Sequence, residues 1–272
     1  MMIADSNFLL VMGMTAFAGL ATGIGGAVAF FAKRTNARLL SASLGFSGGV
    51  MLYISFVELL AGAENSLREQ FGGSRGAACA VLAFFGGILL AALIDRLIPA
   101  VENPHEAHGV EEIDTGALSV ENRKKLGRSG VLFALAIGIH NFPEGLATFA
   151  AGMNSLELGV SIALAIAIHN VPEGIAVSVP LFYATGSREK AFFYSCLSGL
   201  AEPTGALAGY LILHPFLNET ILQILFALVA GIMVFITFDE LLPAAERYGE
   251  HHISLYGLIG GMLLMALVLS AV

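Results

Sequence analysis

Long runs of apolar residues, separated by short polar segments, dominate the chain. A membrane-spanning helix needs about 20 mainly apolar residues, and eight runs reach this length. The runs are too long and too uniformly apolar for the alternating strands of a membrane barrel. We therefore predict an all-α polytopic membrane protein with eight transmembrane helices. The predicted spans cover residues of about 8–32, 39–63, 76–98, 130–153, 157–184, 190–213, 220–243 and 253–272.

The composition places most of the chain in lipid. It is 57% hydrophobic and 12% charged, with a mean hydropathy of +0.81, whereas soluble domains carry roughly 25% charged residues. The sequence has no basic patch of the kind that would indicate a nucleic-acid partner. The first apolar run is preceded by no Lys or Arg, so we expect it to stay as a span rather than be removed as a signal peptide. We treat residues 1–272 as one transmembrane domain.

One long polar segment, residues 99–129, separates the third and fourth predicted spans. Its prolines, acidic residues and basic run are typical of a loop. Of the 13 Lys and Arg residues, 11 fall in loops on the same side of the membrane as this segment. Because positively charged loops stay in the cytoplasm, we expect the 99–129 loop to be cytoplasmic and both termini to face outside.

A polar motif occurs twice inside the apolar runs. Ala-Ile-Gly-Ile-His-Asn-Phe-Pro-Glu-Gly-Leu-Ala begins at Ala136, and Ala-Ile-Ala-Ile-His-Asn-Val-Pro-Glu-Gly-Ile-Ala begins at Ala165. The copies lie on consecutive spans, which run in opposite directions, so they form an inverted repeat. Apolar composition alone does not produce such a polar repeat by chance.

A weaker repeat relates the second and seventh spans. Residues 49–64 and 231–246 are identical at 9 of 16 positions, including Glu58 and Glu240. Together the two repeats relate spans 1–3 to spans 6–8 around a central hairpin of spans 4 and 5. Inverted repeats are the usual construction of secondary transporters, with the site near the middle of the bilayer.

Each copy of the motif places a histidine and a glutamate four residues apart in mid-span, on one helix face. A charged side chain at the bilayer centre costs roughly 2.5–3.5 kcal/mol on insertion scales, and a shared divalent cation would offset that cost. Imidazole nitrogen and carboxylate oxygen suit zinc, iron, cobalt and manganese. A single buried histidine would more often be a hydrogen-bonded core residue, but two inverted copies favour a metal. The candidate ligands are His140, Asn141, Glu144, His169, Asn170 and Glu173.

Other polar residues are less decisive. Glu202 lies near the middle of the sixth span, and we expect it to join the cluster. Glu58 and Glu240 lie nearer the span ends and are either relay ligands or ordinary interfacial carboxylates. His105 and His108 either capture metal or are incidental loop residues. The two cysteines, at positions 79 and 196, are expected to be buried small hydrophobes.

Two other functions are compatible with buried polar residues. An intramembrane metal hydrolase would need similar ligands, but HExxH is absent and an inverted repeat favours alternating access. An open channel is not distinguished from a carrier by sequence. The energy source, the order of metal preference and the formation of a homodimer also stay open. The expected partners are metal ions and the lipid bilayer, and no enzyme activity or resident cofactor is predicted.

With these motifs, the chain resembles the ZIP (Zrt-, Irt-like protein) metal transporters, most closely their bacterial branch. The likeness covers nearly the whole chain and implies import across the bacterial inner membrane, with Zn²⁺ as main substrate and Fe²⁺, Mn²⁺, Co²⁺ or Cd²⁺ as lesser ones. It implies two adjacent metal positions that share Glu144 and Glu173. His140 and His169 would serve one position; Asn141, Asn170 and Glu202 would serve the other. Pro203 directly after Glu202, and a short, His-poor loop, depart from the family pattern.

Overall fold

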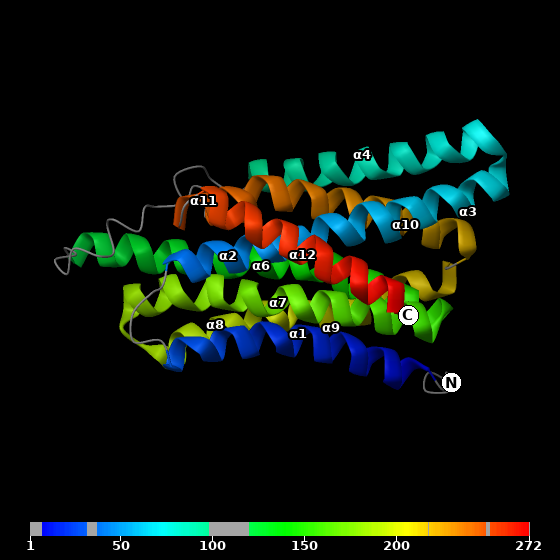
Figure 1. The fold of residues 1–272 in the computed structure, drawn as a ribbon. Helices are drawn as coiled ribbons and strands as arrows, with labels where there is room; N and C mark the ends of the chain where they lie inside the picture. Colours follow the sequence, from blue (N-terminus) through cyan, green and yellow to red (C-terminus); the bar gives the residue numbers. More distant parts are fainter. Residues whose placement is uncertain (1–6, 32–36, 98–119, 217, 249–250, 272) are drawn as a thin grey trace.

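The computed structural model describes residues 7–31, 37–97, 120–216, 218–248 and 251–271, and these form helices joined by short turns. The α-helices are α1 (Phe8–Phe31), α2 (Ala37–Tyr53), α3 (Ala61–Phe71), α4 (Gly73–Leu97), α6 (Val120–Asn154), α7 (Leu156–Thr185), α8 (Arg188–Gly199), α9 (Ala201–Ala208), α10 (Glu219–Ile236), α11 (Leu242–Tyr248) and α12 (His251–Ala271). Figure 1 shows them lying roughly along one axis, with the start of α1 and the end of α12 at the same end of the bundle.

In the part of the chain that the structure describes, three π-helical turns interrupt the helices. Ile54–Leu60 joins α2 to α3, and Thr237–Leu241 joins α10 to α11. A third, Gly209–Leu213, follows α9 and leads into the 3₁₀ turn His214–Phe216. The helices thus combine into eight rods within the described residues: α1, α2–α3, α4, α6, α7, α8–α9, α10–α11 and α12.

Six rods include segments long and apolar enough to cross a membrane, namely Phe8–Ala27, Arg38–Phe71, Gly73–Arg96, Leu156–Val179, Glu219–Glu246 and His251–Ser270. This finding bears out the all-helical, multi-pass architecture. The described residues of the other two rods, α6 and α8–α9, include no such segment, and the second of these rods is broken. The break comes at Leu200, between α8 and α9.

Two rods extend further than the apolar pattern suggested. The second continues through α3 to Phe71, beyond the expected end near residue 63, and Arg68 pairs there with Glu64 one turn earlier. Helix α6 begins at Val120, inside the segment 99–129 that reads as a loop. Polar helical turns outside the bilayer carry no apolar signal, so sequence reasoning ended both helices too close to the membrane. His105 and His108 lie outside the described residues.

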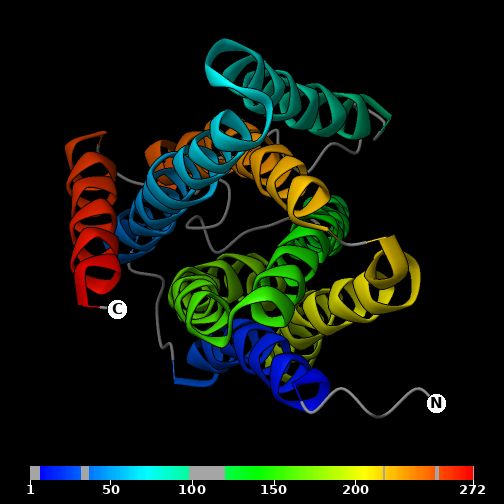
Figure 2. The same ribbon diagram turned by 90° about the vertical axis from the view of Figure 1, so that its right-hand side faces the viewer.

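The rods form two bundles, which Figure 2 shows end-on. Bundle A contains α1, α6, α7, α8 and α9; bundle B contains α2, α3, α4, α10, α11 and α12. Within bundle A, α1 packs along α7 and α8, and α6 packs on α7 and α9; within bundle B, α2 packs on α12 and α10 on α4. The bundles meet where α2 contacts α7 and where α10 contacts α6.

Glycine lets α1 and α7 approach closely within bundle A. A Cβ atom added at Gly25 would lie 2.0 Å from the carbonyl oxygen of Val171, and one added at Gly174 would lie 1.9 Å from that of Thr22. No real Cβ tolerates such distances, so a larger residue at either position would push the helices apart. Gly174 directly follows Glu173, and the tight contact therefore fixes the helix that carries three of the seven candidate ligands.

Candidate metal site

A tight turn between α6 and α7 brings the two motif copies to the same level. Asn154 ends α6, Leu156 begins α7, and the Ser155 hydroxyl between them caps α7 by accepting a hydrogen bond from Leu158 N at 3.4 Å. The first motif histidine precedes this turn by about as many residues as the second follows it. The two antiparallel helices therefore present both motifs to one another in the middle of bundle A.

Each histidine lies against the glutamate of the other helix. His140 Nε2 is 3.3 Å from Glu144 Oε1 on its own helix and 3.5 Å from Glu173 Oε1 on α7. His169 Nε2 is 3.2 Å from Glu144 Oε1 across the pair. All four side chains are at most 2% exposed. Glu144 thus touches both imidazoles, as a carboxylate shared by one ion site would.

The donor atoms converge on a volume that one ion can fill. His140, His169 and Glu173 each offer a ligand atom, and these atoms lie within 4.8 Å of one another. Among the described residues, Oε2 of Glu144 and Oε2 of Glu173 have no hydrogen-bond partner, and Oε1 of Glu144 has only its ion-pair contacts with the two imidazoles. Buried carboxylate oxygens without a partner are costly, and a divalent cation would satisfy them.

The two motif asparagines use their amide nitrogens, and not their carbonyl oxygens, for hydrogen bonds. Asn170 Nδ2 donates to the carbonyl of Ala18 on α1 at 2.9 Å and also to the Glu202 carboxylate, and Asn141 Nδ2 donates to the carbonyl of Ser198 on α8 at 3.4 Å. These bonds use the amide protons. Oδ1 of both asparagines is left without a partner among the described residues and is available as a metal ligand.

Glu202 joins the cluster although Pro203 follows it. Proline cannot donate to the carbonyl four residues earlier, which here belongs to Gly199, and α8 ends at that residue. The chain restarts as α9, with Glu202 in its first turn and fully buried. A Cβ on Gly145 would lie 2.0 Å from the Glu202 carbonyl oxygen, so α9 lies directly against α6 here. The departure at Pro203 breaks the helix without removing Glu202 from the site.

Ser47 of α2 is a site residue that the sequence did not reveal. Its side chain is fully buried, and its hydroxyl lies 3.4 Å from Glu173 Oε1 and 3.2 Å from the carbonyl oxygen of His169, to which it can donate. Through Ser47, α2 of bundle B contacts two residues of the cluster. A serine on an otherwise apolar helix carries no signal that would single it out.

Several other predicted residues lie elsewhere. Glu58 lies in the π-helical turn Ile54–Leu60 and is partly exposed, and Glu240 lies in the π-helical turn Thr237–Leu241 and is 7% exposed. Glu240 also lines a cavity that reaches His140. Cys79 and Cys196 are free thiols, both partly buried.

Known proteins resemble this chain over nearly its full length. The sequence pattern of the ZIP zinc transporter family matches residues 9–269. The chain is 62% identical to the zinc transporter ZupT of Akkermansia muciniphila over 98% of this chain and 99% of that protein. It is 58% identical to the zinc transporter ZupT of Nitratidesulfovibrio vulgaris (98% and 99%) and 57% identical to that of Lysinibacillus sphaericus (97% and 98%).

These likenesses decide between a transporter and an intramembrane enzyme. The relatives are transporters, and the match includes both copies of the motif and every helix of the site. The prediction of a transporter rather than an intramembrane hydrolase is thereby confirmed. The chain belongs to the ZIP zinc transporter family of multi-pass membrane proteins.

Proposed function

We propose that this protein imports zinc into the cytoplasm through the buried cluster between α6 and α7. The observation that carries the proposal is the convergence of His140, His169 and Glu173, whose ligand atoms lie within 4.8 Å of one another at full burial. The relatives' names as zinc transporters support zinc as the substrate. A mixed nitrogen and oxygen site without thiolate suits an ion that must leave again.

The cluster divides into two adjacent metal positions in this proposal. His140 and His169 serve the first position, and Asn141, Asn170 and Glu202 serve the second. The hydrogen bond from Asn170 to Glu202 and the ion-pair distances around Glu144 support this division. Glu144 and Glu173 belong to both positions. The oxygen-rich second position would accept Fe²⁺, Mn²⁺, Co²⁺ or Cd²⁺ as lesser substrates.

An inverted repeat underlies the transport mechanism that we propose. Gly49 of α2 and Gly231 of α10 are equivalent in the weaker sequence repeat, and each packs closely on another helix. A Cβ on Gly49 would lie 2.0 Å from a carbonyl oxygen of α12. A Cβ on Gly231 would lie 1.9 Å from a carbonyl oxygen of α4. The π-helical turns Ile54–Leu60 and Thr237–Leu241 also fall at equivalent positions.

The other glycine contacts follow the same relation. Gly145 on α6 and Gly174 on α7 end the two motifs, and they pack on α9 and α1 respectively. Spans 1–3 thus correspond to spans 6–8 around the α6–α7 hairpin, and α6 and α8–α9 complete eight crossings. Such symmetry supports a carrier that alternates between two related conformations.

The orientation follows from the basic residues. We place both termini outside and the 99–129 segment in the cytoplasm of a bacterial cell, with residues 1–272 forming one transporter domain in the inner membrane. In a chain whose Cys79 and Cys196 are replaced by Ala, Ser74→Cys should react with an impermeant maleimide added to intact cells. Glu189→Cys, at the opposite end of the bundle, should react only after lysis. The reverse labelling would overturn the import direction.

Radiolabelled zinc uptake by the purified protein in liposomes tests the function itself. We expect uptake that saturates at low zinc concentration and exceeds that of empty liposomes. A comparison with and without a pH gradient would identify the energy source. Because all the proposed ligands belong to one chain, the site is complete without a homodimer partner. No uptake above the empty liposomes, or a flux that rises linearly without saturation, would contradict the carrier.

A further inference from the structure

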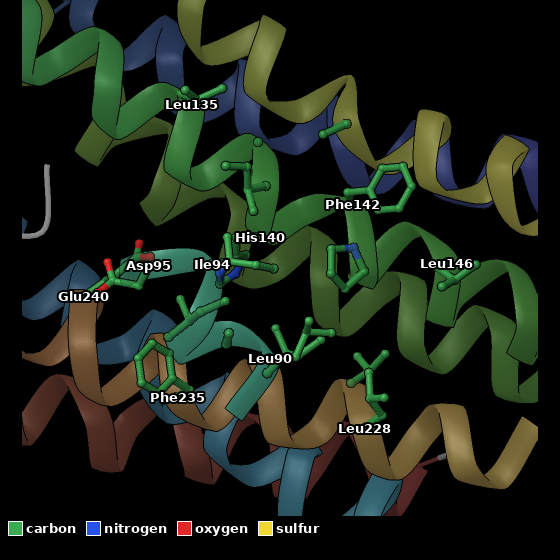
Figure 3. Close-up of a pocket in the computed structure, with 18 of the residues that line it drawn as sticks. Leu90, Ile94, Asp95, Leu135, His140, Phe142, Leu146, Leu228, Phe235 and Glu240 are labelled. Carbon is green, nitrogen blue, oxygen red and sulfur yellow. The ribbon is translucent and has the colours of Figure 1, made fainter. Parts of the chain in front are cut away.

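A groove between the two bundles borders the proposed metal site at His140 and is lined by no other proposed ligand. It lies between α4, α6 and α10 and has a volume of about 610 Å³, within the ~300–1,000 Å³ range of small-molecule sites. Figure 3 shows Asp95 and Glu240 together at one end of the groove and Leu146 and Leu228 toward the other. His140 of the metal site lies between the two ends.

The groove wall is almost entirely apolar. Leu90, Ile94, Ile139, Phe142, Leu228 and Phe235 are among its side chains, and the charged residues lie at one end. Apolar cavities of protein interiors stay dry and accept apolar molecules. Water is therefore a poor occupant for most of this groove, and an apolar molecule is a good one.

The groove opens onto the surface that faces the bilayer. Leu90 on α4 is 42% exposed and Leu135 on α6 is 57% exposed, although both line the groove. Leu89, the neighbour of Leu90, is 70% exposed. In a multi-pass membrane protein, exposed leucines at this depth contact lipid. The groove is thus continuous with the lipid-facing surface and needs no opening motion to admit a lipid.

The length of the groove fits one lipid chain. Its lining on α6 runs from Leu135 to Leu146, and eleven residues of helix span about 16 Å. One leaflet of the hydrocarbon core is about 15 Å thick. Arg96, exposed at the cytoplasmic end of α4 next to Asp95 of the groove, supplies a cation at the level of lipid phosphates.

We propose that an acyl chain of a bilayer phospholipid occupies this groove and forms the wall of the metal site beside His140 and Pro143. The chain would cover the lateral side of the site between α6 and α10, where the groove reaches His140. It would add a lipid layer to the protein side chains that already leave His140 only 2% exposed. This inference rests on the membrane placement of the chain and not on zinc transport.

The protein contains no tryptophan, which allows a clean fluorescence test. Leu90→Trp places the single tryptophan in the groove, and Leu89→Trp places it one residue away on the same helix, facing bulk lipid or detergent. Each purified variant is titrated in detergent micelles with phosphatidylcholine brominated on one acyl chain, because bromine quenches tryptophan on contact. We expect the tryptophan at position 90 to be half-quenched at a severalfold lower lipid-to-detergent ratio than that at position 89.

Coincident quenching curves would overturn the proposal, because the groove would then hold no retained lipid. The proposal would also be overturned if the tryptophan at position 89 is quenched and the one at position 90 stays fluorescent. In that case lipid does not reach the groove, for example because a second copy of the chain covers it. Adding Leu228→Phe to Leu90→Trp should narrow the groove and move its curve to that of Leu89→Trp; an unmoved curve would contradict the placement. If Leu90→Trp does not fold, Leu135→Trp on the opposite lip provides the reporter.

Discussion

Replacing Ser47 by alanine should weaken zinc binding by about tenfold. The Ser47 hydroxyl reaches Glu173 Oε1 at 3.4 Å and leaves Oε2 of the same carboxylate free to face the metal. A hydrogen bond to a charged group contributes about 1.5–3 kcal/mol, and the long distance places this one near the lower limit. About 1.4 kcal/mol corresponds to a factor of ten in affinity. Losses of 10- to 100-fold are typical when a group that orients a metal ligand is removed.

Two further variants separate this role from a simple loss of packing. Ser47→Thr keeps the hydroxyl and should bind zinc nearly as tightly as the native chain. Ser41→Ala removes another fully buried serine hydroxyl of α2 that has no hydrogen-bond partner among the described residues, so it should leave zinc affinity unchanged. The assay is the zinc dissociation constant measured by competition with a chelating dye, with the KM for uptake measured in parallel. Native affinity in Ser47→Ala, or an equal loss in Ser41→Ala, would refute the reasoning.

Three more outcomes follow from the site. His169→Ala should impair zinc uptake more than manganese or iron uptake, because imidazole favours zinc, and Glu202→Ala should reverse that bias. If both variants lose the uptake of every metal equally, per amount of inserted protein, the site is a single cooperative one. Zinc affinity should fall as the pH is lowered from about 8 to about 5, since the ligands must lose protons to bind metal; a constant dissociation constant would contradict this. Gly145→Ala should destabilise the protein by about 3 kcal/mol through overpacking against α9. Gly86→Ala lies inside α4 and its Cβ would meet nothing within 4 Å, so it should not lower the thermal unfolding temperature in detergent.

The helices could be predicted largely from the sequence because lipid demands long apolar segments. Predicted and observed starts differ by at most three residues for α1, α4, α7 and α12. The polar extensions to Phe71 and from Val120 were missed since they lie beyond the apolar pattern. The π-helical turns were also missed, because inserting one residue into a helical turn leaves no mark in composition.

The candidate site could be predicted where its residues are polar and the span around them is apolar. His140 and Glu173 stand out because each is a polar residue in an apolar span, and the repeat ties them together. The structure brings all seven predicted ligands to one region, while their roles in metal binding stay a proposal. Ser47 could not be found in this way, since a serine costs little in an apolar helix and its importance depends on the packing of α2 against α7.

The central claim is that zinc crosses the membrane at the buried cluster, and zinc uptake by Glu173→Ala tests it most directly. The variant should insert normally, because losing a buried carboxylate does not make a span less apolar. Native and variant proteins are reconstituted into liposomes in equal amounts, and radiolabelled zinc uptake is measured per inserted molecule. The account predicts saturable uptake by the native protein and uptake no greater than that of empty liposomes by the variant. Native-like uptake by Glu173→Ala would contradict it.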